Sequence, residues 1–522
     1  MPKGKPLLKE LNNAKNKSKK KGRHQHADPE TADEFLAAGV DQEEGGEKWR
    51  AGDPVKAMRF FMRAIEIYDN GLAKFPTSFD LAYNKYAHKI LHVLVCMEEV
   101  LMICRARVQY EITQHPKLAT QLPAPQIKIL HIALQSHRHA LVLDQDNADV
   151  LFNTAQVLTS LAEALTESKR ANEGRIQEAM KYLNEALELF QRCLVVQELR
   201  YTESQEQIKM LEANETPQTS AEEPAAEEMD TESEAPPQEE WAAVVEPVTK
   251  DTLVDTAVAQ LETLATLCGL LALDGGNGLA WVEEYSYDLL RTRIAAYVEG
   301  TDREQEVALA RAIFVAALTE VLYRSGRADV ETYQRELSGA FSPELDLSEN
   351  PEGLCSKAEA LTSFNSAIAD NPPAGNMEEV QKSLVSRWQA LTAALEALTT
   401  ASKLASADNV PKIHIARGDA EMSRWRLGRP PWSYPVAGEN APTLLKNAQT
   451  YYRGAAALAR RDGDSEQEKE GSCKEALAAA LAGDKTKLDQ LRSVDSEKVM
   501  GIAQEMIEDG LVGLDDAESL LM

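Results

Sequence analysis

The sequence predicts an all-α protein built from repeated antiparallel helix pairs, and three observations support this prediction. Leu, Ala and Glu are abundant while only 6% of the residues are aromatic, a composition that favours helices over sheets. A chain of 522 residues is too long for one hydrophobic core unless that core grows by adding units. Several predicted helices also carry small and bulky residues at a recurring spacing.

The chain begins with a predicted disordered basic tail, residues 1–30. This tail holds nine Lys or Arg and too little apolar surface to fold alone. Its densest part, KNKSKKKGR from Lys15 to Arg23, is a candidate nuclear-import or nucleolar-retention signal. The alternative is a solvated tail that keeps the terminus soluble.

The predicted N-terminal helical lobe, residues 31–208, opens with the clearest helix pair, residues 45–76. Where two helices cross closely, small side chains let the backbones approach, and a bulky residue fills the space beside them. The pair has a small residue on its first helix, a glycine in its turn and a small-bulky-small series on its second helix: Gly45, Gly52, Ala57, Phe61 and Ala64.

A long apolar helix is predicted next, over residues 80–107, followed by a proline-marked linker and a helix over 127–143. The long helix contains His88, His92 and Cys96 at a spacing that is compatible with a metal ion. Because no second cluster of ligands accompanies them, we interpret these residues as core packing. No metal and no cofactor is expected.

A second helix pair follows within the same lobe. Ala155 is the small residue of its first helix, and Ala179 and Ala186 flank a leucine on the second helix, predicted over 176–194. The interval between Ala155 and Ala179 is wider than in the first pair. The sequence therefore predicts lengthened helices or an inserted turn near residues 168–175.

Residues 209–249 form a predicted disordered acidic linker that divides the chain. They contain twelve Asp or Glu, and no basic residue lies between Lys209 and Lys250. Trp241 directly follows two glutamates, which is unusual in such a segment. It is therefore a candidate anchor to a partner or to the fold itself.

The predicted C-terminal helical lobe, residues 250–465, starts with helices over 251–273, 279–297 and 303–325. Two further small-bulky-small series follow, and the second of them is preceded by a glycine on the previous helix. The residues concerned are Ala360, Phe364, Ala367, Gly418, Ala448, Tyr452 and Ala455.

Two segments of this half are predicted to interrupt the helices. The stretch RPPWSYP, residues 429–435, is too rich in proline for a helix and predicts a loop that carries Trp432 and Tyr434. Beyond the lobe, residues 466–522 are predicted to hold a charged linker, short helices from about Cys473 onwards, and an acidic tail.

The four series resemble the tetratricopeptide repeat (TPR) family, in units spread over residues 30–465. The resemblance implies a TPR-like antiparallel helix-pair solenoid that binds a peptide or helix in a concave groove. One TPR subclass clamps the terminal carboxylate of heat-shock chaperones, but Gln42 and Gly46 replace the Lys and Asn which that clamp needs. The helical register predicts that four polar residues face the groove: Asn153, Gln156, Arg417 and Glu421. The alternative interpretation for each is an ordinary exposed polar residue on a helix.

The charge of the chain indicates the kind of partner. A net charge of -28 argues against direct nucleic-acid binding, which needs a basic face, and favours a basic protein client. An acidic tract inside a TPR array also resembles histone chaperones of the nuclear autoantigenic sperm protein type. That resemblance implies a chaperone or escort for a basic nuclear or ribosomal protein, such as a histone. The alternative is an adaptor that joins subunits, with the acidic tract as a mere linker.

No catalytic motif competes with this interpretation. No Ser-His-Asp order, nucleophile elbow or paired-carboxylate site stands out from the helical pattern, so no enzyme activity is expected. The six cysteines are widely spread, as is typical of reduced core residues in an intracellular protein. No segment resembles a signal peptide or a membrane span, and we expect a cytoplasmic or nuclear protein, or one found in both places.

Overall fold

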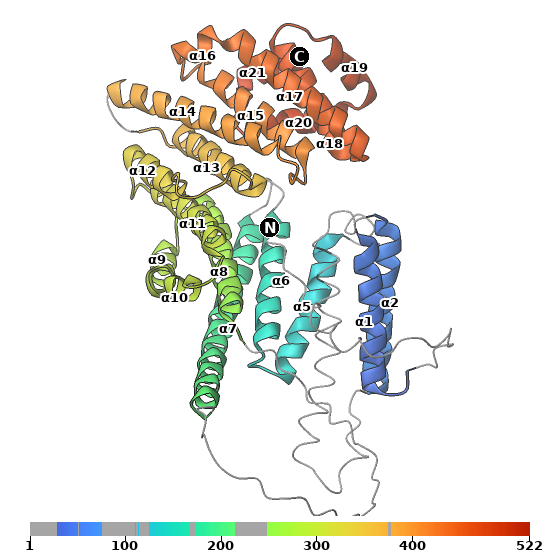
Figure 1. The fold of residues 1–522 in the computed structure, drawn as a ribbon. Coiled ribbons are helices and arrows are strands. Elements are labelled where there is room, and N and C mark those ends of the chain that lie inside the picture. The colour runs from blue at the N-terminus through green and yellow to red at the C-terminus, as the bar shows by residue number, and fades with distance from the viewer. Residues whose placement is uncertain are drawn as a thin grey trace, which may run out of the picture. The chain divides into compact units, whose positions relative to one another are not determined.

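The computed structural model describes residues 29–50, 52–75, 110, 113, 125–166, 173–214, 248–373 and 377–521. Within these residues no strand is present, which confirms the all-α prediction (Figure 1). The predicted basic tail, the predicted helix over 80–107 and most of the acidic linker, with Trp241, lie outside the described residues. The elements are α1 (Ala32–Arg50), α2 (Pro54–Lys74), α5 (Gln126–Leu143), α6 (Ala148–Thr166), α7 (Glu173–Asn214), α8 (Lys250–Leu273), α9 (Leu279–Asp288), η3 (Leu289–Arg293), α10 (Ile294–Val298), α11 (Glu304–Arg324), α12 (Val330–Ala340), α13 (Pro351–Asp370), α14 (Met377–Ala401), α15 (Val410–Leu427), α16 (Pro435–Glu439), α17 (Ala441–Asp462), α18 (Ser465–Leu481), α19 (Thr486–Val494), α20 (Ser496–Glu508) and α21 (Leu514–Leu521).

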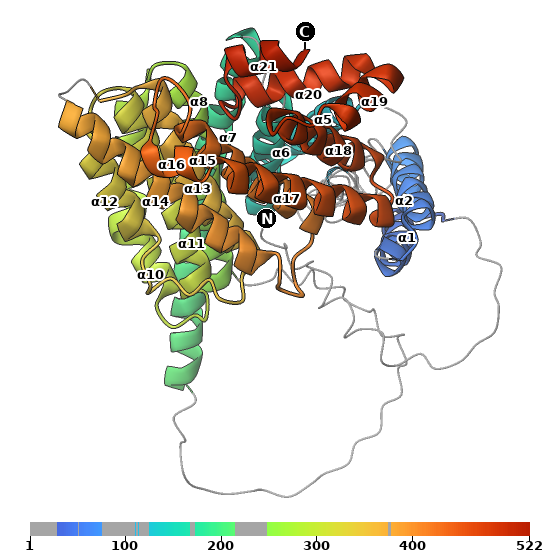
Figure 2. The ribbon, with the colours of Figure 1, turned by 90° about the horizontal axis from the view of Figure 1, so that it is seen from above.

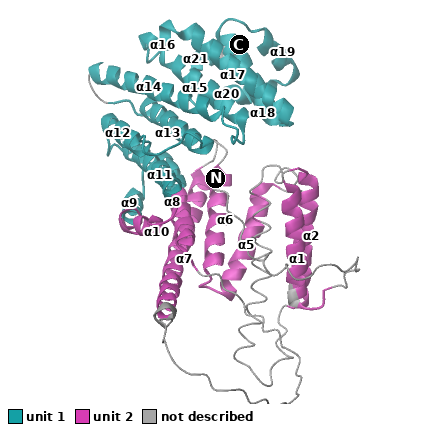
Figure 3. Cartoon of the chain, viewed as in Figure 1, with its two compact units in different colours: residues 1–26, 264–287, 304–522 teal, residues 27–263, 288–303 magenta. Residues whose placement is uncertain are grey.

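The described chain divides into two compact units (Figure 3). Unit 2 holds the helices up to residue 263 together with residues 288–303, and unit 1 holds residues 264–287 and 304–522. The boundary runs through α8, whereas the sequence predicted it at the acidic linker. The first half of α8 belongs with α7 because the buried Thr256 hydroxyl donates a 2.8 Å hydrogen bond to the side-chain oxygen of Gln197.

The α1–α2 hairpin of unit 2 is the first predicted helix pair. α2 begins where the Asp53 side chain accepts a 2.9 Å hydrogen bond from the backbone N–H of Lys56. Ala57, Phe61 and Ala64 of α2 are buried. The two helices pack on one another along their length.

Two consecutive glycines of α1 face aromatic rings of α2: the predicted packing residue Gly45 faces Phe60, and Gly46 faces Phe61. A Cβ built at Gly46 would lie 2.7 Å from the Phe61 ring, whereas one built at Gly45 would meet Phe60 at 2.7 Å. One residue corresponds to a rotation of about 100° around the helix axis. Both positions need glycine, because any Cβ there would overlap an aromatic ring.

The second predicted pair is α6 and α7, in which Ala155, Ala179 and Ala186 are fully buried. The sequence predicted that this helix ends near residue 194, but α7 continues to Asn214. The added stretch, ELRYTESQEQIKMLEAN, contains no Gly or Pro and is rich in strong helix formers. The inserted turn predicted near residues 168–175 falls largely outside the described residues.

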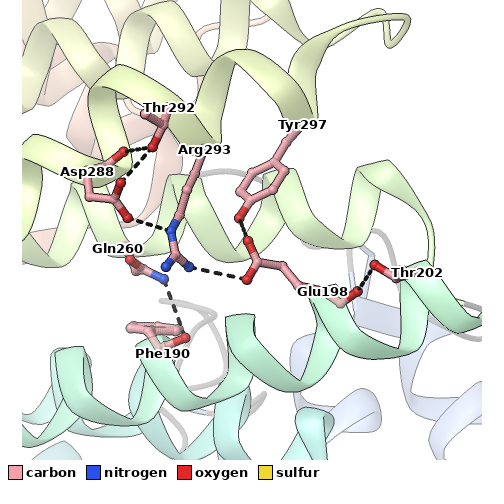
Figure 4. Close-up of polar contacts among 8 residues, drawn as sticks. All are labelled: Phe190, Glu198, Thr202, Gln260, Asp288, Thr292, Arg293 and Tyr297. Atoms are coloured by element: carbon pink, nitrogen blue, oxygen red, sulfur yellow. Dashed lines mark hydrogen bonds and ion pairs between the residues drawn. The ribbon is translucent and has the colours of Figure 1, made fainter.

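A π-helical turn interrupts the helix predicted over 279–297. In η3 the backbone N–H of Ile294 donates to the carbonyl of Leu289, five residues back. Beside it, the Thr292 hydroxyl donates a 2.7 Å hydrogen bond to the carbonyl oxygen of Asp288 (Figure 4). A side chain that bonds to the backbone in this way competes with the regular helical ladder. Hydrophobic periodicity does not register such a local change.

Unit 1 stacks its helices largely in chain order. α13 packs on α14, α14 on α15, α15 on α17 and α17 on α18, and Figure 2 shows the last two side by side. In the third predicted series, on α13, Phe364 and Ala367 are buried and Ala360 is partly buried. Helix pairing between chain neighbours is thus the rule in this unit, as the sequence predicted.

The fourth predicted pair is α15 and α17, which approach one another closely at Gly418. A Cβ built at Gly418 would lie 2.3 Å from the ring of Tyr452, and that ring is fully buried. Ala448 and Ala455, one turn to either side of Tyr452, are buried too. Trp432 lies in the segment between α15 and α16, where the sequence predicted a loop.

The core of unit 1 continues past residue 465, where the sequence predicted a charged linker. α18 starts at Ser465 because the Asp464 side chain accepts a 3.0 Å hydrogen bond from the backbone N–H of Gln467. One cluster of buried side chains extends from Ile415 to Ala517 and includes residues of α15, α17, α18, α20 and α21. In the first turns of this packed helix, charged residues such as Glu466 and Lys469 lie on its exposed side.

α8 is the one described helix that is long and apolar enough to cross a membrane by length and composition alone. Its most apolar window has a mean hydropathy of 1.5, and 67% of that window is buried inside the protein. A buried core helix passes the same test of composition. Packing inside the protein therefore explains the apolar side chains of α8.

Candidate partner-binding surface

The sequence-predicted groove residues lie in different parts of the chain. Asn153 and Gln156 are half-buried on α6 in unit 2, whereas Arg417 and Glu421 lie on α15 in unit 1. Trp241 lies outside the described residues. The four described residues therefore belong to two separate units.

Glu421 is an internal residue, and its prediction as a groove residue is corrected. Its side chain is 1% exposed, and its two carboxylate oxygens accept hydrogen bonds from Arg424 and Asn447, both at 2.9 Å. Arg417 is also held within the unit, with its guanidinium 4.0 Å from the centre of the Tyr451 ring. Register alone did not show this, because α17 covers this side of α15.

A different surface of unit 2 carries the features expected of a partner-binding face. Val195, Leu199 and Met210 of α7 are 53%, 60% and 65% exposed. At 100° per residue these positions fall within about 60° of one another around the helix. Single exposed apolar residues are ordinary, but aligned ones on a long helix indicate a face that lacks its cover. We name Val195, Leu199 and Met210 the α7 face.

Acidic residues accompany the α7 face. Glu203 and Glu206 are exposed on the same part of α7, although Arg200 and Lys209 partly balance them. Directly after α7 the sequence enters the acidic tract, which has no basic residue before Lys250. An apolar strip beside clustered carboxylates suits a partner with an apolar side and a basic side.

A polar network holds the middle of α7 in place. Figure 4 shows Arg293 between two carboxylates: its Nε donates to Asp288 at 2.8 Å, and its Nη1 lies 3.4 Å from Glu198 of α7. The Tyr297 hydroxyl also donates to Glu198. Burial and the neighbouring Glu198 carboxylate raise the pKa of Tyr297, so the phenol stays a donor. The α7 face thus lies on a helix fixed at Glu198.

The sequence after residue 194 indicates this face, although the repeat pattern drew the prediction to other helices. The residues after 194 keep a helical composition, and Val195 and Leu199 are one turn apart in it. The groove was instead assigned to first helices, following the TPR resemblance. Which side of α7 is exposed depends on which side packs against α6, and the sequence alone does not show that.

Two described cysteines, Cys193 and Cys268, are buried. Burial raises the pKa of the Cys193 and Cys268 thiols to about 12, which makes both of them poor nucleophiles at neutral pH. Within the described ranges, no three His, Cys, Asp or Glu side chains are grouped so that they could hold a metal ion. His88, His92 and Cys96 lie outside those ranges.

Comparison with known proteins identifies relatives but no family. No family model matches the chain. The UPF0656 protein C926.02 of Schizosaccharomyces pombe is 24% identical over an alignment of 446 residues that covers 81% of this chain and 84% of that protein. The uncharacterized protein YNL193W of Saccharomyces cerevisiae is 27% identical over an alignment of 188 residues that covers 34% of this chain and 32% of that protein. Neither name states an activity or a partner.

Among solved structures, a circular tandem repeat protein with novel repeat topology has a TM-score of 0.29 and 14% identity. The match covers 94% of this chain and 99% of that protein. A TM-score of this size carries no argument about function or repeat type. The fold described above therefore rests on the helix contacts within each unit.

Proposed function

We propose that this chain is a non-enzymatic helical-repeat protein of TPR type that escorts a basic protein client, such as a histone or a ribosomal protein, in the cytoplasm, the nucleus or both. The α7 face binds an apolar side of the client, and the acidic tract that follows α7 covers its positive charge. The observation that carries the proposal is the exposure of Val195, Leu199 and Met210 directly ahead of that tract.

The α7 face and the acidic tract would contribute to client binding in different ways. Apolar contact area supplies affinity, because burying a Val, Leu or Met side chain removes its surface from water. Clustered carboxylates mainly raise the association rate and keep a basic client from binding other polyanions. A client segment that forms an amphipathic helix with Lys or Arg on one side meets both requirements.

A structural adaptor is the second candidate function. Helix pairs stacked in chain order offer long surfaces for joining subunits, and the acidic tract would then be only a linker. The two functions differ in one measurable property. An escort loses affinity for basic clients when the tract loses its charge, and an adaptor does not.

The first test replaces the α7 face by polar residues. We expect the triple variant Val195→Ser, Leu199→Ser and Met210→Ser to bind core histones or a basic ribosomal protein about 30-fold more weakly, roughly 2 kcal/mol. Isothermal titration calorimetry with the full chain measures this. The matched control, Ile132→Ser with Val142→Ser, removes two exposed apolar residues of α5 in the same unit. Equal losses in both variants, or no loss in the triple variant, would count against the α7 face.

The second test neutralises the acidic tract. Converting the Asp and Glu residues of 215–247 to Asn and Gln keeps the length of the tract and leaves α7 and α8 intact. We expect slower association with the basic client and a weaker dependence of affinity on salt, because the long-range attraction is lost. Stopped-flow kinetics at several salt concentrations measure both. Unchanged affinity and unchanged salt dependence would favour the adaptor.

A further inference from the structure

Unit 1 gathers arginine and tryptophan side chains from α14, α15 and the segment after α15. The Arg387 guanidinium lies 4.4 Å from the centre of the Trp432 ring, and that of Arg424 lies 4.2 Å from the Trp388 ring. Arg429 lies 5.6 Å from the Trp425 ring. Such a positive, aromatic cluster contrasts with the net charge of -28 of the whole chain.

Two of these arginines have carboxylate partners. Arg424 pairs with Glu421 at 2.9 Å, and Arg429 of the segment after α15 pairs with Asp516 of α21 at 2.7 Å. These pairs neutralise their charges locally.

Arg387 has no carboxylate partner in the part of the chain that the structure describes. Its side chain is 3% exposed, its Nε donates to the side-chain oxygen of Asn365 at 2.9 Å, and its Nη1 has no hydrogen-bond partner among the described residues. Native proteins rarely leave a buried polar group unpaired, because the group loses its water without gaining an acceptor. An unpaired buried guanidinium therefore calls for a ligand or a cost to stability.

Arg426 makes the shortage of negative charge greater. It is half-buried, and its Nη1 donates to the backbone carbonyl of Pro430. Burial, together with the charge of Arg426, lowers the pKa of Arg387 to about 10, although Asp370 and Tyr323 act in the opposite direction. Burial likewise lowers the pKa of Arg426, with Arg429 adding to it and Asp515 and Asp516 opposing it.

We propose that Arg387 and Arg426 together bind an oxyanion carried by a peptide, either a carboxylate of an acidic run or a phosphate group. The planar guanidinium fork matches both groups through paired N–H donors. The Trp432 ring stacks on the face of the Arg387 guanidinium, and the Arg387 side chain is buried. Binding therefore requires segment 428–434, most of which is exposed, to move aside. The site lies in unit 1 and is independent of the α7 face.

The test uses the full chain and two dye-labelled peptides, one with a run of glutamates and one with a single phosphoserine, measured by fluorescence anisotropy. We expect Arg426→Gln to weaken binding of the recognised peptide at least tenfold. This half-buried position tolerates the change better than Arg387, and circular dichroism checks the fold. Arg335→Gln on α12 removes an exposed arginine of the same unit and should leave the affinity unchanged.

A second variant separates binding from a structural role. Trp432→Ala removes the ring that covers Arg387 and should tighten peptide binding severalfold, while Trp281→Ala, at a half-exposed tryptophan of the same unit, should not. A cluster that serves only packing predicts weaker or unchanged binding in Trp432→Ala. Weaker or unchanged binding by Trp432→Ala would overturn the proposal. Equal binding by wild type and Arg426→Gln would overturn it too, and so would a failure of both peptides to bind at millimolar concentration. Displacement by inorganic phosphate at concentrations below the peptide dissociation constant would identify free phosphate and overturn the peptide assignment.

Discussion

Lys474→Met is expected to lower the free energy of unfolding of unit 1 by about 3 kcal/mol, the usual cost of breaking a buried ion pair. Lys474 of α18 is 4% exposed, and its ammonium lies 3.0 Å from Asp419 and 3.1 Å from Glu470. Asp419 also accepts a 2.7 Å hydrogen bond from the hydroxyl of the buried Tyr452. The substitution therefore disturbs one network that joins α15, α17 and α18.

The charge of Lys474 is held by its partners. Burial alone would lower the pKa of Lys474, but Asp419 and Glu470 outweigh burial and raise that pKa well above its usual range. A raised lysine pKa contributes stability that is present below the unfolded value of about 10.4 and is lost only as pH rises through the folded value. The penalty of Lys474→Met should therefore stay constant between about pH 6 and pH 9.

Urea unfolding followed by tryptophan fluorescence measures the effect on unit 1. Of the described tryptophans, Trp281, Trp388, Trp425 and Trp432 lie in unit 1 and Trp49 lies in unit 2, so the signal reports mainly on unit 1. The control is Lys469→Met on the same helix, where an exposed lysine lies 3.8 Å from Glu466. Such a pair contributes about 0.5 kcal/mol or less. Equal losses in the two variants would refute the buried network.

Unit 2 is expected to lose stability in acid because of His137, and the variant His137→Leu is expected not to show this loss. His137 of α5 has no exposed surface, and neither ring nitrogen has a hydrogen-bond partner among the described residues. Burial lowers the pKa of His137 to about 4. The unfolded chain takes up this proton near pH 6.5, so between pH 6.5 and 4 the unfolded state binds more protons and folding loses stability as pH falls.

The size of this effect follows from the two pKa values. A difference of about 2.5, at roughly 1.4 kcal/mol for each tenfold change, corresponds to about 3 kcal/mol between pH 6.5 and 4. Thermal unfolding of wild type and His137→Leu at several pH values measures it, because the variant lacks this contribution. His139→Leu, at an exposed imidazole two residues away, serves as the control and should follow wild type. A wild type and a His137→Leu variant with parallel pH profiles would contradict the prediction.

The helices themselves could be predicted from local sequence. The spacing of Ala57, Phe61 and Ala64 predicted the second helix of a pair, and the prolines of 429–435 predicted a loop, because each signal acts within a few residues. One local signal was missed, the cap at the start of α18. α18 was expected to start late because its first turns are charged, yet the capping of Gln467 by Asp464 starts it at Ser465.

The candidate sites were harder to predict than the helices. Glu421 reads as an exposed polar residue in sequence, and only its contacts with Arg424 and Asn447 show that it is internal. Arg387 lies beside Trp432 although the two are separated by 45 positions in the numbering and by α15 in the chain. No local pattern predicts such a contact, because it depends on how α14 and the segment after α15 meet.

By itself, the sequence determined that this protein is all-α, that its helices pair with chain neighbours, and that an acidic tract separates two helical stretches. Those properties follow from composition and short-range spacing, since helix formation and hairpin packing are local. Only the tertiary structure decided that Gly46 faces Phe61 and, among the described residues, that the α7 face is exposed and that Arg387 is buried without a carboxylate partner. Exposure and ion pairing are set by which helices cover which, and that depends on residues far apart in the chain.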